Sequence, residues 1–212
     1  MTAVYELRQY TLRPGQRDAL ITLFDREFVE TQEALGIRVV GQFRDRERPD
    51  RFVWVRGFDS MAARAASLAA FYDGPAWRTH RDAANATMIA FDDVLLLRPA
   101  GLDFDLTGAA RDTPPSSVVV ATLGYLAEPP DPASIPRLAT GGTPLARLCT
   151  EYAENDFPAL PVRTGEHVVV EFTSFGSENE WHDHTGRLAE LPGGPLRRER
   201  LVLAPTARSL LR

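Results

Sequence analysis

Lysine is absent from this sequence of 212 residues, so all 24 basic side chains are arginines. The absence of lysine excludes Schiff-base catalysis, a lysine-bound pyridoxal phosphate and the lysine-containing phosphate-binding loop. Arginine keeps its proton at every physiological pH, so these side chains can bind anions but cannot act as ordinary bases. The basic residues therefore favour anion binding over proton transfer.

Cysteine is almost as scarce, since Cys149 is the only one. A single cysteine excludes an internal disulfide, a Cys-x-x-Cys redox pair and a cysteine-rich zinc site. Its apolar surroundings favour a buried structural thiol over a nucleophile. No apolar run approaches the roughly 18 residues of a membrane-spanning helix, and the N-terminus lacks the pattern of a signal peptide. We therefore expect a cytoplasmic protein.

Positive charge is also too sparse for nucleic-acid binding. The 29 acidic residues outnumber the arginines, the net charge is −5, and the sequence contains no basic run. A chain of this kind is a poor candidate for binding nucleic acid or an anionic membrane. Its composition, 44% hydrophobic and 25% charged, is that of an ordinary globular protein.

Proline is distributed unevenly and divides the chain. Twelve of the 16 prolines follow residue 100, and the segment 99–117 has the proline, glycine and serine content typical of a linker. The sequence thus predicts a first unit over residues 1–100, a linker over 101–117 and a second unit over 118–212.

The first unit alternates strands and helices in the order of a ferredoxin-like fold. Predicted strands cover residues 4–12, 37–43, 52–58 and 91–98. Of the predicted helices, the first has an apolar stripe of Leu20, Phe24, Phe28 and Leu35, the second covers 61–72, and the third starts at Pro75. Gly36 is expected to end the first helix in a left-handed conformation. The resulting order, βαββαβ, is that of the split βαβ unit.

The second unit repeats this order incompletely. Predicted strands cover residues 118–125, 145–154 and 166–175. A proline-broken stretch, 129–142, stands where the first helix should be, and the second helical region is short. Phe58 and Phe175 each end a strand just before a helix begins. We interpret the pattern as an internal duplication whose second copy has lost helix, with the proline-rich segment 129–161 packed over its own half.

Short motifs in the first unit point to a known family. The chain opens with Tyr-Glu-Leu-Arg-Gln-Tyr-Thr-Leu-Arg-Pro-Gly at residues 5–15. Val-Val-Gly-Gln-Phe follows at 39–43 and Val-Trp-Val-Arg-Gly-Phe-Asp-Ser at 53–60, and then come Arg64 and Trp77. Over about the first hundred residues these stretches resemble the NIPSNAP family.

This resemblance implies a dimeric α/β barrel, in which two antiparallel ferredoxin-like sheets pack face to face. We therefore expect an α+β fold in which two tandem ferredoxin-like units form such a barrel within one chain, an arrangement with which a homodimer is compatible. The wider superfamily includes cofactor-independent monooxygenases, cyclases, isomerases and haem enzymes, while most NIPSNAP members have no assigned reaction. The resemblance therefore predicts the fold but specifies little about the function.

Two predicted strand faces carry polar residues that need partners in a covered sheet. Glu6, Arg8 and Tyr10 share one face, and Trp54 and Arg56 share another. If these faces meet, Glu6 forms a buried ion pair with Arg8 or Arg56 under an aromatic wall. The pair either belongs to a substrate cleft, where arginine polarises an enol or carboxylate, or is purely structural.

His80 is the candidate base of that cleft, because it shares a predicted helix with Trp77 and lies near Tyr72. A neutral imidazole near apolar walls could take a proton from a phenol or an activated C–H group. The alternative is a helix-surface histidine bonded to solvent or a carboxylate. We predict His80 and Arg56 as catalytic residues. The predicted substrate-binding residues are Arg8, Tyr10, Trp54, Tyr72 and Trp77, for which a plain core role is the alternative.

A second, weaker candidate site lies near the C-terminus. His182 and His184 are close to Glu171 if the preceding strand leads into their segment. On a helix the two imidazoles would point about 200° apart, so a metal site would require an extended segment. We therefore predict neither a metal nor a cofactor.

The predicted function is cofactor-free chemistry on a hydrophobic, aromatic or polyketide-like small molecule, by oxygenation, isomerisation or cyclisation. Oxygen chemistry without a cofactor needs a substrate that can become an electron-rich anion, which arginines and a histidine base would assist. The alternative is a ligand-binding or protein-interaction module without catalysis. An enclosed cleft would favour the enzyme, and a space filled by side chains would favour the module.

Overall fold

The computed structural model of the chain describes residues 3–111, 116–138, 141–184, 194 and 196–212. Its strands are β1 (Val4–Leu12), β2 (Arg38–Asp45), β3 (Arg51–Phe58), β4 (Met88–Leu102), β5 (Val118–Leu126), β6 (Thr143–Thr150), β7 (His167–Phe175) and β8 (Arg197–Pro205). Its helices are α1 (Arg17–Leu23), the π-helix η1 (Phe24–Phe28), α2 (Val29–Glu33), α3 (Met61–Tyr72), α4 (Pro75–Ala86) and α5 (Glu178–His184).

The strands close into an antiparallel barrel in the order β1-β3-β2-β8-β5-β7-β6-β4. Strands β1 to β4 form one arc of the barrel, called the first arc, and strands β5 to β8 form the second arc. The arcs join where Phe43 of β2 faces Pro205 of β8 and where Leu97 of β4 faces Thr150 of β6. The sequence predicted that two sheets pack face to face. In the structure the edges of the two arcs also pair with each other. Closure leaves no unpaired sheet edge at these two seams.

The barrel interior is an apolar core to which both arcs contribute. Leu7 and Val55 from the first arc meet Leu123, Val170 and Leu203 from the second. Side chains alternate between the two faces of a strand, so the residues between these point outward. On β1 this places Glu6, Arg8 and Tyr10 on the outer face, as predicted, where they are buried under a helical layer.

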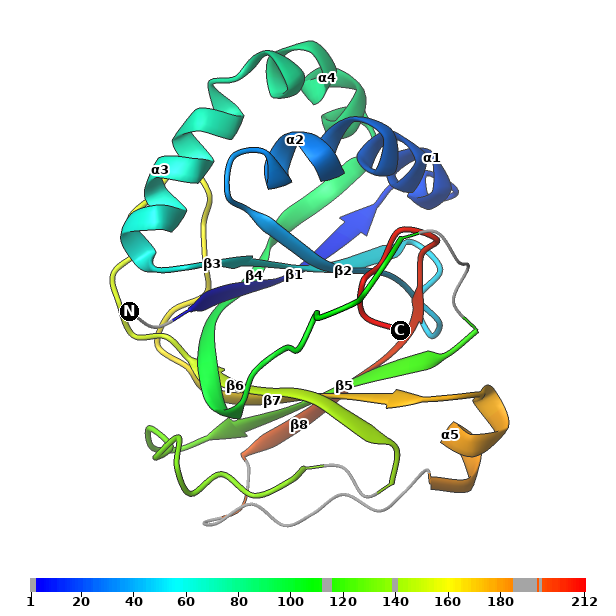
Figure 1. Cartoon of the computed structure of the whole chain (residues 1–212), viewed down its shortest axis with the longest axis vertical. Coiled ribbons are helices and arrows are strands. Elements are labelled where there is room, and N and C mark those ends of the chain that lie inside the picture. Colours follow the sequence, from blue (N-terminus) through cyan, green and yellow to red (C-terminus); the bar gives the residue numbers. More distant parts are fainter. Residues whose placement is uncertain (1–2, 112–115, 139–140, 185–193, 195) are drawn as a thin grey trace.

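That layer consists of α1 to α4 and covers only the first arc (Figure 1). The Oγ of Ser60 accepts a hydrogen bond from the Ala63 N–H at 3.1 Å and caps α3, whose predicted extent is confirmed. Gly36 has φ +81° and turns the chain into β2, as predicted. The first predicted helix is instead divided, because a π-turn interrupts it. It ends at Glu33, so the expected core position of Leu35 is wrong and that side chain is 37% exposed.

The two predicted strand boundaries that differ most from the structure are the ends of β4 and β6. β4 continues through Pro99 to Leu102, so the predicted linker begins inside a strand. The extra length has a cause: β4 pairs with β1 through its first residues and with β6 through its last, which closes the barrel. β6 ends at Thr150 and does not reach residue 154. Residues 112–115 of the predicted linker lie outside the described part of the chain.

The second arc has a thinner outer cover. Ile135 and Leu138, from the segment between β5 and β6, pack on Val169. Trp181 of α5 packs on Phe175 at 5.3 Å between ring centroids. The described residues between β5 and β6 contain no helix, as expected from their prolines. Within the described chain, no helix combines the length and apolarity required to cross a membrane.

Candidate functional site

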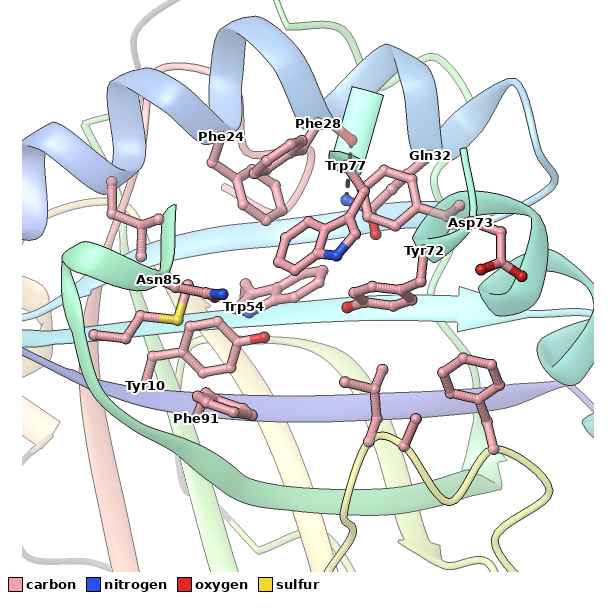
Figure 2. Close-up of a pocket in the computed structure, with 16 residues that line it drawn as sticks. Tyr10, Phe24, Phe28, Gln32, Trp54, Tyr72, Asp73, Trp77, Asn85 and Phe91 are labelled. Carbon is pink, nitrogen blue, oxygen red and sulfur yellow. Dashed lines mark hydrogen bonds between the residues drawn. The ribbon is translucent and has the colours of Figure 1, made fainter. Parts of the chain in front are cut away.

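A cavity of about 390 Å³ lies between the helical layer and the outer face of β1 and β3. This volume falls in the range of small-molecule sites, roughly 300–1,000 Å³. Its walls are mainly aromatic: Tyr10, Phe24, Phe28, Trp54, Phe71, Tyr72, Trp77, Phe91 and Phe157. Gln32, Asp73 and Asn85 add polar groups (Figure 2). The space between sheet and helices is therefore open, and not filled by side chains.

Helix and strand periodicity both direct rings into this cavity. On the first helix, Phe24, Phe28 and Gln32 recur every fourth residue, and the π-helical turn Phe24–Phe28 forms this part of the wall. On the sheet, Arg8 is paired in register with Trp54. The rings contact one another edge to face, as Phe24 and Trp54 do at 4.8 Å between centroids and Tyr72 and Trp77 at 4.9 Å. Such contacts favour a defined orientation of each ring relative to its neighbours.

Behind the aromatic wall lies a buried group of charges, Glu6, Arg8, Arg56 and Arg64, which we call the charge network. All four side chains are fully buried. Arg8 Nη1 lies 2.6 Å and Arg56 Nε 2.7 Å from Glu6 Oε2, while Arg64 Nε lies 2.7 Å from Glu6 Oε1. Burial alone would raise the pKa of Glu6, but Arg56, Arg8 and Arg64 outweigh it and hold that pKa well below its usual range. Glu6 is therefore a carboxylate at neutral pH.

The charge network reaches the cavity through Tyr10. Arg8 Nε donates a hydrogen bond to the Tyr10 hydroxyl at 2.9 Å. Burial raises the pKa of Tyr10, although Arg8 acts in the opposite direction. The phenol consequently keeps its proton at neutral pH and can donate it. Figure 2 shows the hydroxyls of Tyr10 and Tyr72 pointing toward each other across the cavity.

Around the charge network, arginines outnumber carboxylates, and some buried hydrogen-bond donors have no acceptor among the described residues. Three arginines face the carboxylate of Glu6, and Arg64 also pairs with Asp156, so the five side chains together carry one net positive charge. Among the described residues, no acceptor bonds to Arg8 Nη2 or to Trp54 Nε1, although both atoms are buried. Such donors favour an anionic or oxygen-bearing ligand.

The structure brings together most of the predicted binding residues. Tyr10, Trp54, Tyr72 and Trp77 all line the cavity. Arg8 and Arg56 lie behind this wall, with their guanidinium carbons 5.6 Å and 5.1 Å from the centre of the Trp54 ring. The predicted buried ion pair is present, and it includes both arginines that were considered. The binding and catalytic roles of these residues stay predictions.

His80 is not on the cavity wall. Its Nε2 lies 3.2 Å from the Glu27 carboxylate, and its ring contacts Phe28 at 6.3 Å between centroids. The histidine thus packs beside the outer part of η1 and pairs with a partly exposed carboxylate, as in the alternative considered for it. Its role as a base stays a prediction, and in this conformation the imidazole does not face the cavity.

Glu171 and His182 of the second candidate cluster each pair with a residue outside it. Glu171 is buried on β7, where it pairs with Arg147 at 2.8 Å and accepts a hydrogen bond from the Leu138 N–H. His182 lies on α5 with its Nε2 3.7 Å from Glu178. The side chain of His184 lies outside the described part of the structure. Within that part, no group of three or more His, Cys, Asp or Glu side chains is arranged to hold a metal.

Sequence reasoning missed the contribution of the second half to the cavity. Phe157, Ala159 and Leu160 belong to the loop between β6 and β7, yet they line the cavity of the first arc. The expectation that the whole segment 129–161 covers its own half is therefore wrong for its last part. Nothing in the local sequence signals this crossing. In the sequence Arg64 stands out only as a motif residue, because its contact with Asp156 forms only in the folded chain.

Comparison with known proteins identifies a family that resembles the N-terminal half of the chain. Residues 5–102 match the NIPSNAP family. The N-terminal half of the chain is NIPSNAP-like. A NIPSNAP family protein of unknown function from Agrobacterium tumefaciens has 23% identity to this chain, with a TM-score of 0.43 over 46% of this chain and 88% of its own. No curated protein matches the sequence.

Two solved structures match along nearly the full length. A candidate monooxygenase from Lactobacillus acidophilus is 13% identical and has a TM-score of 0.57, covering 97% of this chain and 94% of its own. Another candidate monooxygenase, from Fusobacterium nucleatum, is 6% identical with a TM-score of 0.55, covering 97% and 93%. At these identities the likeness establishes the fold alone, an α/β barrel, and nothing about the reaction.

Proposed function

We propose that the NIPSNAP-like half binds an aromatic or polyketide-like small molecule in the cavity of about 390 Å³. The observation that supports this best is the combination of an open aromatic chamber with a fully buried, net positive charge network behind its wall. Rings such as Trp54 and Trp77 provide apolar contact area, and few polar groups are available to orient the ligand.

Tyr10 is the proposed contact for an oxygen of the ligand. Its hydroxyl accepts a hydrogen bond from Arg8 and so presents its own proton to the cavity. A donor that is itself bonded to a cation stabilises developing negative charge, as in other preorganised oxyanion sites. Arg8 acts through Tyr10 as a positioning residue, and Arg56 acts one step further back through Glu6.

A ligand held in this way is favoured as a phenolate or enolate, which is the form that cofactor-free oxygenation, isomerisation or cyclisation requires. The two full-length structural matches are described as candidate monooxygenases, which supports oxygenation as the first reaction to test. His80 and Arg56 were the predicted catalytic residues. Since His80 faces Glu27, stabilisation of the anion by Tyr10 is the better supported contribution.

The tandem arrangement also belongs to this proposal. Within the first arc the strand order is β4-β1-β3-β2, and within the second it is β8-β5-β7-β6. Numbered from the start of each half, both orders are 4-1-3-2. This repetition supports two ferredoxin-like copies, over residues 1–100 and 118–212, of which the first carries the site and the second completes the barrel.

Binding is tested with the matched probes 1-naphthol and naphthalene, followed by quenching of tryptophan fluorescence. We expect saturable binding of both, with 1-naphthol bound about tenfold more tightly because of one hydrogen bond to the Tyr10 hydroxyl. Ala159→Trp, on the cavity wall, should abolish binding, whereas Ala153→Trp, outside the lining on the same loop, should not. Binding that is unaffected by Ala159→Trp would overturn the proposed location.

Catalysis is tested separately by oxygen uptake with 1,3-dihydroxynaphthalene, an electron-rich phenol that ionises readily. Oxygen consumption that depends on the protein and is lost in Ala159→Trp would support an oxygenase. Tight binding without turnover would instead favour the alternative, a ligand-binding module with the same cavity.

A further inference from the structure

We propose that residues 155–160, here called the strap, form a movable wall that the C-terminal half places over the NIPSNAP-like cavity. In this proposal the ion pair between Arg64 and Asp156 latches the strap, and Phe157 and Leu160 select ligands by size. The proposal rests on the proposed function for the identity of the ligand only. The latch itself can be tested without any ligand.

The strap lies far in sequence from the site it covers. It belongs to the loop between β6 and β7, which Figure 1 shows in yellow rising from the second arc toward α3. Phe157 stacks on Tyr72 with 5.9 Å between ring centroids and an interplanar angle of 27°. Leu160 is 8% exposed and packs with the aromatic side chains of the cavity. The cavity is therefore incomplete without the second half of the chain.

One arginine connects the strap to the charge network. Arg64, fully buried on α3, donates through Nε to Glu6 and through Nη1 to Asn155 Oδ1 at 3.1 Å, and the same Nη1 contacts Asp156. The Asp156 side chain remains 26% exposed. When the strap is in place, Asp156 offsets one of the positive charges beside the ligand. When it is displaced, the network gains attraction for an incoming anion.

The strap is built to move as one piece. Asn155 Nδ2 donates to the Leu160 carbonyl at 2.9 Å, and Asn155 Oδ1 accepts from the Phe157 N–H at 3.2 Å, so this side chain holds the loop in shape. The loop is anchored on β4 at both ends, where the N–H of Glu151 bonds the Leu96 carbonyl and the N–H of Arg163 bonds the Val94 carbonyl.

Between these two anchors, side chains alone attach the loop to the rest of the molecule. Within the described chain, no backbone hydrogen bond joins residues 152–162 to another segment. A segment fixed at its ends and held over a cavity by the contacts of Arg64 with Asn155 and Asp156, one ring contact and one buried leucine has the low local stability of active-site lids. A permanent wall would instead share backbone hydrogen bonds with α3 or β3.

The latch is tested by hydrogen–deuterium exchange of the ligand-free protein. Asp156→Asn removes the charge but keeps the shape of the side chain, and we expect exchange at the amides of Phe157 and Leu160 to accelerate about fivefold. Glu154→Gln makes the same chemical change on the same loop and should leave exchange unchanged. Equal exchange in Asp156→Asn and the wild type would overturn the latch, whether or not the protein binds ligands.

Gating and size selection are tested by stopped-flow binding of 1-naphthol. Asp156→Asn should raise the association and dissociation rates by similar factors, because opening affects both. Phe157→Ala with Leu160→Ala should admit 1-pyrenol, which the wild type excludes. Unchanged rates, or exclusion of 1-pyrenol by the double variant, would make the strap a fixed wall. Absence of naphthol binding in all variants would instead count against the proposed function, and the exchange result would still decide the latch.

Discussion

The two arcs of the barrel share a strand order but differ in what their outer faces carry. Phe58 on β3 pairs with Val4 on β1, and Phe175 on β7 pairs with Val118 on β5, so positions in the two arcs can be compared by their distance from these pairs. The first arc has Glu6, Arg8, Tyr10, Trp54 and Arg56 where the second has Val120, Thr122, Gly124, Glu171 and Thr173. The charges and rings of the site are thus concentrated on one arc.

The covers of the two arcs differ accordingly. Over the first arc, aromatic rings from the helices and from the sheet line a chamber between the two layers. Over the second, Ile135, Leu138 and Trp181 pack directly on the strands, and the nearby cavity is smaller, about 280 Å³. The same strand order can therefore support either a binding site or a simple covered core, and the outward side chains together with the cover decide which.

The largest expected effect is on stability, and it separates the two buried carboxylates. Glu6→Gln leaves three buried arginines without their carboxylate and should lower the free energy of unfolding by about 3–5 kcal/mol. Glu171 pairs with Arg147, whose side chain is 15% exposed. Glu171→Gln should therefore lower the free energy of unfolding less, by about 1–3 kcal/mol. Urea denaturation measures both. A larger loss for Glu171→Gln would place the critical network on the second arc.

Acid should weaken the first arc through the same residue. Because the pKa of Glu6 is lowered on folding, its ionisation stabilises the protein fully above the unfolded value of about 4.3 and less as the pH falls below it toward the folded value. Urea titrations between pH 6 and pH 3 should show a loss of stability that is shallower in Glu6→Gln. Parallel pH profiles for the variant and the wild type would contradict the lowered pKa.

A smaller effect is expected on ligand affinity. Tyr10→Phe removes the hydroxyl that Arg8 polarises and should weaken 1-naphthol binding about tenfold while leaving naphthalene binding unchanged. Tyr125→Phe is the matched change on β5, where the hydroxyl donates to Glu199 at 3.2 Å, and it should alter neither affinity. Equal affinity of Tyr10→Phe for the two probes is the decisive signature of this role, and unaltered selectivity would refute it.

The smallest expected effect concerns His80. Since its imidazole pairs with Glu27 outside the cavity lining, His80→Ala should preserve the affinity for 1-naphthol and cost within about 1 kcal/mol of stability. Calorimetry and binding measured on one variant check both values. If a substrate is found, a loss of turnover of 10²-fold or more would restore the sequence-based role of a general base.

The sequence by itself determined the order and approximate positions of the strands and helices of the first arc, and that Glu6, Arg8 and Tyr10 share one face of β1. Both follow from local geometry, since strand alternation and helix periodicity are written in neighbouring residues. The motifs of residues 5–60 likewise led to the NIPSNAP resemblance. The extra length of β4 and the π-turn in the first helix were missed, because each depends on partners elsewhere in the chain.

Only the tertiary structure decided how the site is completed. The joining of β2 to β8 and of β4 to β6, the orientation of His80 toward Glu27, and the pairing of Arg64 with Asp156 link positions far apart in the sequence. No local pattern specifies such contacts, because they depend on how whole elements pack. The outward charges could be predicted from the sequence, whereas the part of the chamber wall that comes from the second half, Phe157, Ala159 and Leu160, could not.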